Sequence, residues 1–158
     1  MAEQHIIGIS DLKAGRSPDT LITFALGSCV GIALYDRITC IGGLAHIMLP
    51  DSSLLRADVN QKKFANTALP LMLRQMEAMG ARRYFITAKI AGGAMLFGQK
   101  DALRIGERNI AAVKSQLVRL GISLTAEDTG LNYGRTMRID LTDGSVTIKT
   151  ALHGTQLL

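Results

Sequence analysis

Two stretches of the sequence decide the fold: residues 23–31 read TFALGSCVG, and residues 42–50 read GGLAHIMLP. The first places one cysteine, Cys29, between glycines in a segment suited to a tight turn. The second places one histidine, His46, inside an apolar run. The two residues are either a catalytic pair or two buried residues of a small core, and the rest of the sequence bears on that choice.

The residues around this pair predict a β-hairpin. Residues 30–36 and 40–49 are apolar runs separated by a three-residue polar segment. Alternation with a period of two places Leu44, His46 and Met48 on one face of the second strand. His46 is therefore expected to project from a rigid element.

The remaining pattern predicts an α+β fold with mostly antiparallel sheet layers and two main helices, in a single domain over residues 1–158. Gly80 and Gly121 follow the two helical patterns as C-terminal caps, and Asp143-Gly144 marks a hairpin turn. Strands are expected at 6–9, at 21–26, within 81–94 before a glycine-rich turn, and in several pieces from 122 onward. Helices are expected at 65–79 and 106–120, a polar turn-like stretch at 13–20, and a polar loop or weak helix over a site at 51–63.

Composition limits the class of protein. With 47% apolar residues the chain has enough material for a core, yet no apolar run approaches the roughly 18 residues of a membrane span. The first residues lack the features of a signal peptide, so a cytoplasmic protein without membrane insertion is expected. The net charge of +5 suits an acidic partner, which could be nucleic acid or an acidic protein. The basic residues are scattered and the chain has only seven Phe and Tyr residues, which argues against nucleic acid. An acidic protein partner agrees with the charge equally well.

The cysteines and histidines do not have the spacing of a metal site. Two cysteines are too few for a disulfide scaffold, and neither a CxxC pair nor an HExxH-like spacing occurs. No metal and no cofactor is therefore expected. Cys40 is interpreted as a small apolar residue at a strand start, and His5 and His153 as exposed.

Cys29 and His46 nevertheless have what nucleophilic catalysis requires. A cysteine nucleophile needs a base within hydrogen-bond reach, and a third group must orient the base. His46 is the candidate base, and Thr23, on the preceding strand, is the candidate orienting group. The segment Gly27–Gly31 has the GxCxG form of a nucleophile elbow, but a β-prone segment follows the cysteine, so the hydrolase-fold version is excluded. The alternative is that both residues are ordinary core residues.

Three other stretches invite functional interpretations, and a structural one is favoured for each. Residues 91–94 (AGGA) lack the lysine of a phosphate-binding loop and predict a tight turn. Residues 105–109 (IGERN) are an acidic helix start, although Asn109 also suits the lining of a site. Glu127 and Asp128 are expected to be solvated carboxylates at a strand end.

Six segments in order resemble the CheD family, the chemoreceptor glutamine deamidases of bacterial chemotaxis. They span nearly the whole chain, and they support a catalytic role for Cys29 and His46 more strongly than the spacing of the two residues does. The segments are LGSCVGIALYD, IGGLAHIMLP, KKFANTALPLMLRQME, AKIAGGAMLF, IGERNIAAV and AEDTGLNYGRTMRIDLTDGSV.

The resemblance implies a role for each candidate residue. The family cysteine lies in its LGSCV motif, here Cys29; its histidine lies in GGxxH, here His46; and its threonine precedes the cysteine by six residues, here Thr23. The implied fold is similar to the catalytic domain of the cytotoxic necrotizing factor toxins. The implied partners are the cytoplasmic helical region of chemoreceptors and a CheC-type phosphatase.

The implied chemistry is a thioester route. A Cys29 thiolate attacks the carboxamide carbon of a receptor glutamine, His46 protonates the departing ammonia, and His46 then directs water to release glutamate. Backbone N–H groups of Ser28 and Cys29 are the candidate oxyanion donors. The same route admits receptor methyl esters. The competing function is a non-catalytic adaptor that regulates a CheC-type phosphatase or the receptor array.

Overall fold

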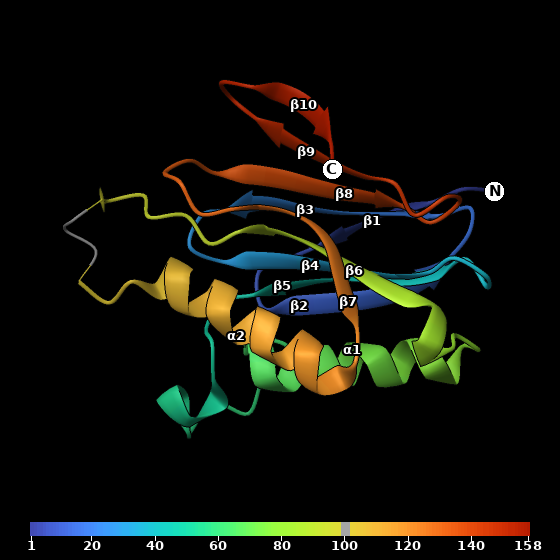
Figure 1. The fold of residues 1–158 in the computed structure, drawn as a ribbon, viewed down its shortest axis with the longest axis horizontal. Coiled ribbons are helices and arrows are strands. Elements are labelled where there is room, and N and C mark those ends of the chain that lie inside the picture. Colours follow the sequence, from blue (N-terminus) through green and yellow to red (C-terminus); the bar gives the residue numbers. More distant parts are fainter. Residues whose placement is uncertain (99–101) are drawn as a thin grey trace.

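The computed structural model describes residues 1–98 and 102–158 of the chain. Its elements confirm the predicted α+β class (Figure 1). In chain order they are β1 (Gln4–Ile7), β2 (Asp11–Arg16), β3 (Thr20–Leu26), β4 (Val30–Asp36), β5 (Ile41–Ile47), the 3₁₀ turn η1 (Ser52–Leu55), α1 (Ala65–Ala78), η2 (Arg83–Phe85), β6 (Ile86–Gly92), α2 (Ile105–Leu120), β7 (Ser123–Thr129), β8 (Arg135–Asp140), β9 (Val146–Thr150) and β10 (Gly154–Leu157).

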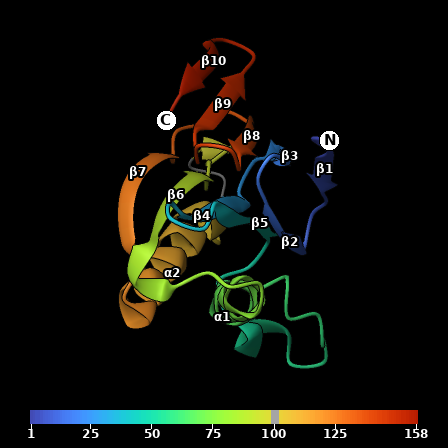
Figure 2. The ribbon, with the colours of Figure 1, turned by 90° about the vertical axis from the view of Figure 1, so that its right-hand side faces the viewer.

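The described residues form three layers. One sheet has the strand order β2-β5-β4-β6-β7 and the other β1-β3-β8-β9-β10. Helices α1 and α2 cover one face of the first sheet, and the second sheet lies over its opposite face (Figures 1 and 2). Pairing is antiparallel except for β1 with β3 and β6 with β7. The expected mostly antiparallel sheet layers are therefore confirmed.

The central strands β4 and β5 are buried along their whole length, because helices cover one face and the second sheet covers the other. This explains why both strands are almost continuously apolar in sequence. Strand residues of one parity face the helices and pack on the apolar stripe of α1, which includes Leu69, Met72 and Met76. Residues of the other parity face the space between the sheets. They meet the inward residues of β3, β8 and β9 there.

Several boundaries differ from the sequence prediction. Residues Lys13–Arg16, expected in a polar turn-like stretch, belong to β2, which pairs with β5 along its whole length. Strand β5 ends at Ile47, so Met48 lies beyond it with 42% of its surface exposed and does not continue the face of Leu44 and His46. Helix α1 contains Pro70 in its second turn and continues through it.

The terminal hairpin and the polar segment after β5 resolve two further expectations. The turn between β8 and β9 contains Gly144 at φ 77°, as the Asp-Gly pair predicted. Residues 51–63 form η1 and turns, fastened by ion pairs of Lys62 with Asp11 and of Lys63 with Asp58. Within the parts of the chain that are described, no helix is long and apolar enough to cross a membrane.

Candidate active site

Cys29 lies in the three-residue connection Gly27–Cys29 between β3 and β4. Strand β3 reaches this connection through a bulge, where its register against β8 shifts between Thr23 and Leu26. Ala25, within the bulge, has φ 58°, a left-handed conformation that side-chain-bearing residues seldom adopt. Bulges of this kind redirect the strand beside many active sites. Here the bulge changes the direction of β3 just before the connection that contains Cys29.

The two residues that follow β6 hold this cysteine loop by its carbonyl groups. The N–H of Gly93 donates to the Cys29 carbonyl at 2.8 Å, and the N–H of Ala94 donates to the Gly27 carbonyl at 2.8 Å. Gly92, at φ 108°, lies so close that a Cβ there would collide with the Cys29 carbonyl oxygen. The prediction of a tight turn over the AGGA segment was wrong, because Ala91 and Gly92 end β6 and the chain continues irregularly from Gly93; the glycines permit close contact with the cysteine loop.

His46 lies on β5, opposite Gly31 of β4 in the antiparallel pair. Cross-strand partners point to the same face, and so do residues two apart on one strand. Cys29, two residues before Gly31, is thus a diagonal neighbour of His46 at the end of the sheet. Both side chains are directed toward the layer between the two sheets, where Cys29 packs against the apolar core and His46 is fully buried.

Thr23 contacts His46 from the facing sheet, as its expected orienting role requires. Its Oγ1 lies 2.7 Å from Nδ1 of His46 and 2.7 Å from the carbonyl oxygen of Ile7, its register partner on β1. The Ile7 carbonyl can only accept, so the Thr23 hydroxyl donates its single proton there. The Thr23 oxygen must then accept from His46, which places the imidazole proton on Nδ1.

This hydrogen bonding leaves Nε2 as the unprotonated nitrogen of His46. Nε2 is buried and has no hydrogen-bond partner among the described residues. Burial lowers the pKa of His46 to about 4, so the imidazole is neutral at pH 7. A neutral imidazole with a free Nε2 is the form that acts as a general base.

Burial also raises the pKa of the Cys29 thiol above its ordinary value. The Cys29 side chain is therefore a thiol at rest, whereas the sequence-based mechanism began from a thiolate. A neutral thiol beside a neutral imidazole requires that the proton be transferred as the sulfur attacks. Catalysis by this pair would therefore require a general base and would not start from a preformed ion pair.

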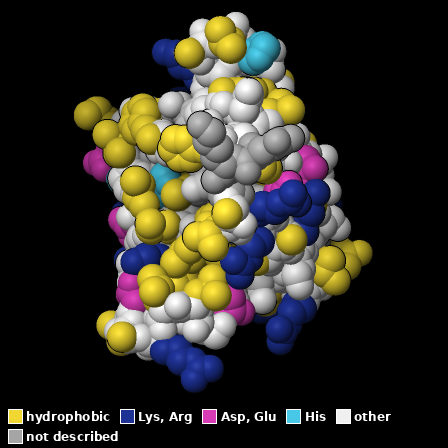
Figure 3. Space-filling model, turned by 90° about the vertical axis from the view of Figure 1, so that its left-hand side faces the viewer, with side chains coloured by type: hydrophobic (Ala, Val, Ile, Leu, Met, Phe, Trp, Pro, Cys, Tyr) yellow, Lys and Arg dark blue, Asp and Glu magenta, His cyan; other side chains and the backbone are white. Residues whose placement is uncertain are grey.

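A cavity of about 310 Å³ gives access to the cysteine loop. Ser28 and Cys29 lie on one side, and exposed apolar side chains form its rim, with exposed fractions of 47% for Leu96, 74% for Phe97 and 68% for Leu103. Figure 3 faces this end of the molecule and shows hydrophobic side chains gathered there beside Lys and Arg side chains. The opening therefore presents an apolar surface.

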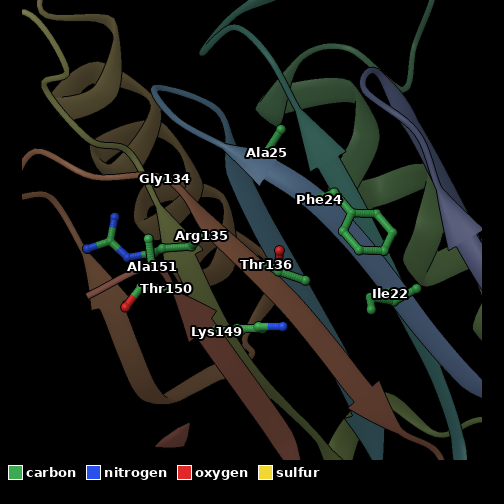
Figure 4. A pocket seen from close by; sticks show the side chains of 9 residues that line it. All are labelled: Ile22, Phe24, Ala25, Gly134, Arg135, Thr136, Lys149, Thr150 and Ala151. Carbon is green, nitrogen blue, oxygen red and sulfur yellow. The ribbon is translucent and has the colours of Figure 1, made fainter. Parts of the chain in front are cut away.

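A larger hollow of about 490 Å³ lies on the outer face of the sheet β1-β3-β8-β9-β10 (Figure 4). Ile22 of β3, Thr136 of β8 and Lys149 of β9 line it. These residues alternate with the inward residues of the same strands. Neither Cys29 nor His46 lines this hollow.

One residue at the site, Asn109, was treated from the sequence mainly as part of a helix start. It lies fully buried on α2, and its Nδ2 donates to the carbonyls of Ser28 at 2.9 Å and Met48 at 3.0 Å. No local spacing signals this contact, because the partners are 81 and 61 residues away in the chain. The sequence signal was weak: Asn109 lies one helical turn before Val113, so both residues share the buried face of α2.

The other residues singled out from the sequence lie elsewhere. Asp128 is not a solvated carboxylate: it pairs at 3.2 Å with Arg135, whose side chain is fully buried. Glu127, in contrast, pairs with Lys114 at the surface, as expected of an exposed carboxylate.

The remaining cysteine and histidines are also accounted for. Cys40 adopts φ 56° in the turn before β5, and its Sγ donates to the Thr142 carbonyl. His153 is exposed, but His5 is partly buried and bonded to Asp19 at 2.9 Å, so the expectation that it is exposed was wrong. Among the residues described, no group of three or more His, Cys, Asp or Glu side chains is placed to hold a metal ion.

Comparison with known proteins shows the family of this chain. The family model described as "CheD chemotactic sensory transduction" matches residues 48–150. A Clostridium botulinum (strain Hall) protein named "Probable chemoreceptor glutamine deamidase CheD" is 52% identical over 153 residues, covering 95% of this chain and 94% of that protein. A Syntrophomonas wolfei protein of the same name is 47% identical over 155 residues, covering 96% of each.

The chain therefore belongs to the CheD family. The family model begins after the candidate residues, but an alignment that covers 95% of this chain omits too few residues to leave out Thr23, Cys29 and His46. Among solved structures, a Neisseria meningitidis protein of the DUF152 family aligns with a TM-score of 0.50 at 10% identity, covering 80% of this chain and 64% of that chain. At that identity the likeness concerns the fold alone.

Proposed function

We propose that this protein hydrolyses the side-chain carboxamide of glutamine residues in chemoreceptors, with Cys29 as nucleophile, His46 as general acid and base, and Thr23 as the residue that orients His46. The observation that carries the proposal is the buried hydrogen-bond chain that joins His46, Thr23 and Ile7, which leaves Nε2 of His46 unprotonated and without a partner among the described residues. His46 lies on the strand paired with the one that Cys29 precedes. Relatives of nearly the same length carry the name chemoreceptor glutamine deamidase. Their name and this geometry support the same chemistry.

The first half of the reaction forms a thioester. Nε2 of His46 takes the thiol proton as the Cys29 sulfur attacks the carboxamide carbon. The resulting imidazolium gives that proton to the amide nitrogen, the carbon–nitrogen bond breaks, and ammonia leaves.

The second half of the reaction hydrolyses the thioester. Water attacks the thioester while His46 takes a proton from it, and the Cys29 sulfur departs as a thiol with that proton. Glutamine and water are thus converted to glutamate and ammonia.

The tetrahedral intermediates need donors for their oxyanion. The N–H groups of Ser28 and Cys29 belong to a loop whose carbonyls are bound by the two residues that follow β6 and by Asn109. In a trans peptide the N–H points opposite to the carbonyl, so these two N–H groups face away from those partners. We assign them to the oxyanion, as the sequence predicted.

The apolar rim of the cavity is suited to a glutamine that is flanked by apolar residues on a receptor helix. Leu96, Phe97 and Leu103 would cover those neighbours, and the net charge of +5 favours the approach of an acidic helical region. Receptor methyl esters fit the same thioester route, since methanol replaces ammonia as leaving group. This function places the protein in the cytoplasm, and the family resemblance implies a CheC-type phosphatase as a second partner.

The proposal is tested by incubating a purified chemoreceptor cytoplasmic fragment with the wild-type protein and with Cys29→Ala. Mass spectrometry should find glutamine-to-glutamate conversion at specific sites with the wild type and none with the variant. Cys40→Ala is the matched control, because Cys40 lies in a distant turn and should leave conversion unchanged. Receptor binding without conversion by the wild type would refute the proposed reaction and favour an adaptor.

A further inference from the structure

We infer that Asn109 is a positioning residue that orients the Ser28–Cys29 peptide so that its N–H faces the oxyanion. This inference rests on the proposed function and names a residue outside the Cys29, His46 and Thr23 group. Asn109 lies on the second turn of α2 and is fully buried. Its Nδ2 contacts the Ser28 carbonyl at 2.9 Å.

The orientation of the Asn109 amide is fixed by its partners. Nδ2 also contacts the Met48 carbonyl at 3.0 Å, and two carbonyls can be satisfied only by the NH₂ group. Oδ1 therefore points the other way, where it is buried and has no partner among the described residues. Burying an unpaired amide oxygen is unfavourable, but an apolar residue here would remove the donor that the Ser28 and Met48 carbonyls share, so holding both segments requires the amide.

The contact with Ser28 controls a single peptide plane. The Ser28 carbonyl and the Cys29 N–H belong to one planar trans unit and point in opposite directions. A hydrogen bond that holds the carbonyl on the α2 side therefore holds the Cys29 N–H on the opposite side. The peptide planes before and after it are held by backbone donors, since Ala94 binds the Gly27 carbonyl and Gly93 binds the Cys29 carbonyl.

Asn109 is thus the side chain that fixes the middle plane of a loop otherwise held by the main chain. Its second contact, with Met48, joins the same amide to the segment that follows His46 by two residues. One side chain on α2 therefore connects the nucleophile loop with the end of the histidine strand. Loss of the amide would free the Ser28–Cys29 peptide to rotate, without removing the thiol, the imidazole or Thr23.

The test compares turnover with simple alkylation in Asn109→Ala and Asn109→Asp. Conversion of the receptor fragment passes through an oxyanion, so kcat should fall about 100-fold while KM changes less than about threefold. Alkylation of Cys29 by iodoacetamide forms no oxyanion and should stay within about threefold of the wild-type rate across the pH range. Val113→Ala, at a buried position one turn further along α2, is the control for lost packing and should retain wild-type kcat.

The outcomes separate this inference from the proposed function. An unchanged kcat in a folded Asn109 variant, with an active wild type, would overturn this inference alone. So would a fall in alkylation rate that parallels the fall in kcat, because it would indicate general disruption of the site. No conversion by the wild type would overturn both. If Asn109→Asp does not fold because it buries a charge, Asn109→Ala still tests the positioning role, since it adds no charge.

Discussion

Replacing Thr23 by valine should separate the orientation of His46 from its presence. Valine has nearly the shape of threonine but removes the hydroxyl that joins His46 Nδ1 to the Ile7 carbonyl, both at 2.7 Å. Without it the imidazole proton is no longer confined to Nδ1, so part of the population carries it on Nε2 and has no base toward Cys29. The variant is therefore expected to fold and to lose turnover.

The expected loss of stability follows from the two buried groups that lose their hydrogen-bond partner. His46 Nδ1–H and the Ile7 carbonyl are buried, and each unpaired group costs about 1–3 kcal/mol. Less the gain of about 0.8 kcal/mol from the buried methyl group that replaces the hydroxyl, Thr23→Val should lower the free energy of unfolding by about 1–5 kcal/mol. In a triad with a carboxylate, loss of the correct tautomer costs roughly 10⁴ in kcat. A neutral hydroxyl orients less strongly, so a loss of about 10- to 100-fold is expected here, or about 1.4–2.8 kcal/mol of barrier.

The assay pairs kcat on the receptor fragment with ¹⁵N chemical shifts of the His46 ring. Wild-type protein should show a protonated Nδ1 and an unprotonated Nε2, and Thr23→Val a mixture of tautomers. Thr23→Ser is the matched control: it keeps the hydroxyl and should retain kcat within about threefold, at a small cost in packing. A wild-type ring protonated on Nε2, or a Thr23→Val protein as active as Thr23→Ser, would refute the reasoning.

Two further predictions concern stability and the loop contact. Because burial lowers the pKa of His46 to about 4 while the unfolded value is about 6.5, the unfolded state binds more protons between those values. The free energy of unfolding should therefore fall by up to about 3 kcal/mol as pH falls from about 6.5 to 4, in urea titrations, and His46→Gln should remove most of that slope. Gly92→Ala should lower stability by at least about 2 kcal/mol and reduce kcat, because its Cβ meets the Cys29 carbonyl at a positive φ. Gly8→Ala, with nothing within 4 Å of the added Cβ, should be close to wild type, and equal effects at both glycines would contradict the close-contact explanation.

The sequence predicted those parts of the site that follow from local periodicity. Alternation along residues 40–47 was enough to direct Leu44 and His46 to one face, and the glycines around Cys29 indicated a tight connection. Both features depend on neighbours in the chain, which the pattern of residues records directly.

The rest of the site depends on contacts between distant segments. Asn109 reaches Ser28 across 81 residues and Met48 across 61 residues. The parallel pairing of β1 with β3 was likewise not indicated by any local signal. Such contacts are selected by the packing of whole layers, so single-residue patterns do not specify them.

The hydrogen bond accepted by the Ile7 carbonyl has a consequence for mutational scanning. A carbonyl can only accept a hydrogen bond, so the Thr23 hydroxyl must donate to it and accept from His46. This direction of the two hydrogen bonds is the same whatever side chain residue 7 carries. Systematic side-chain substitution would record position 7 as a matter of core packing alone. Its chemical contribution belongs to the main chain and would be exposed only by a change that shifts β1 against β3 or replaces the peptide group itself.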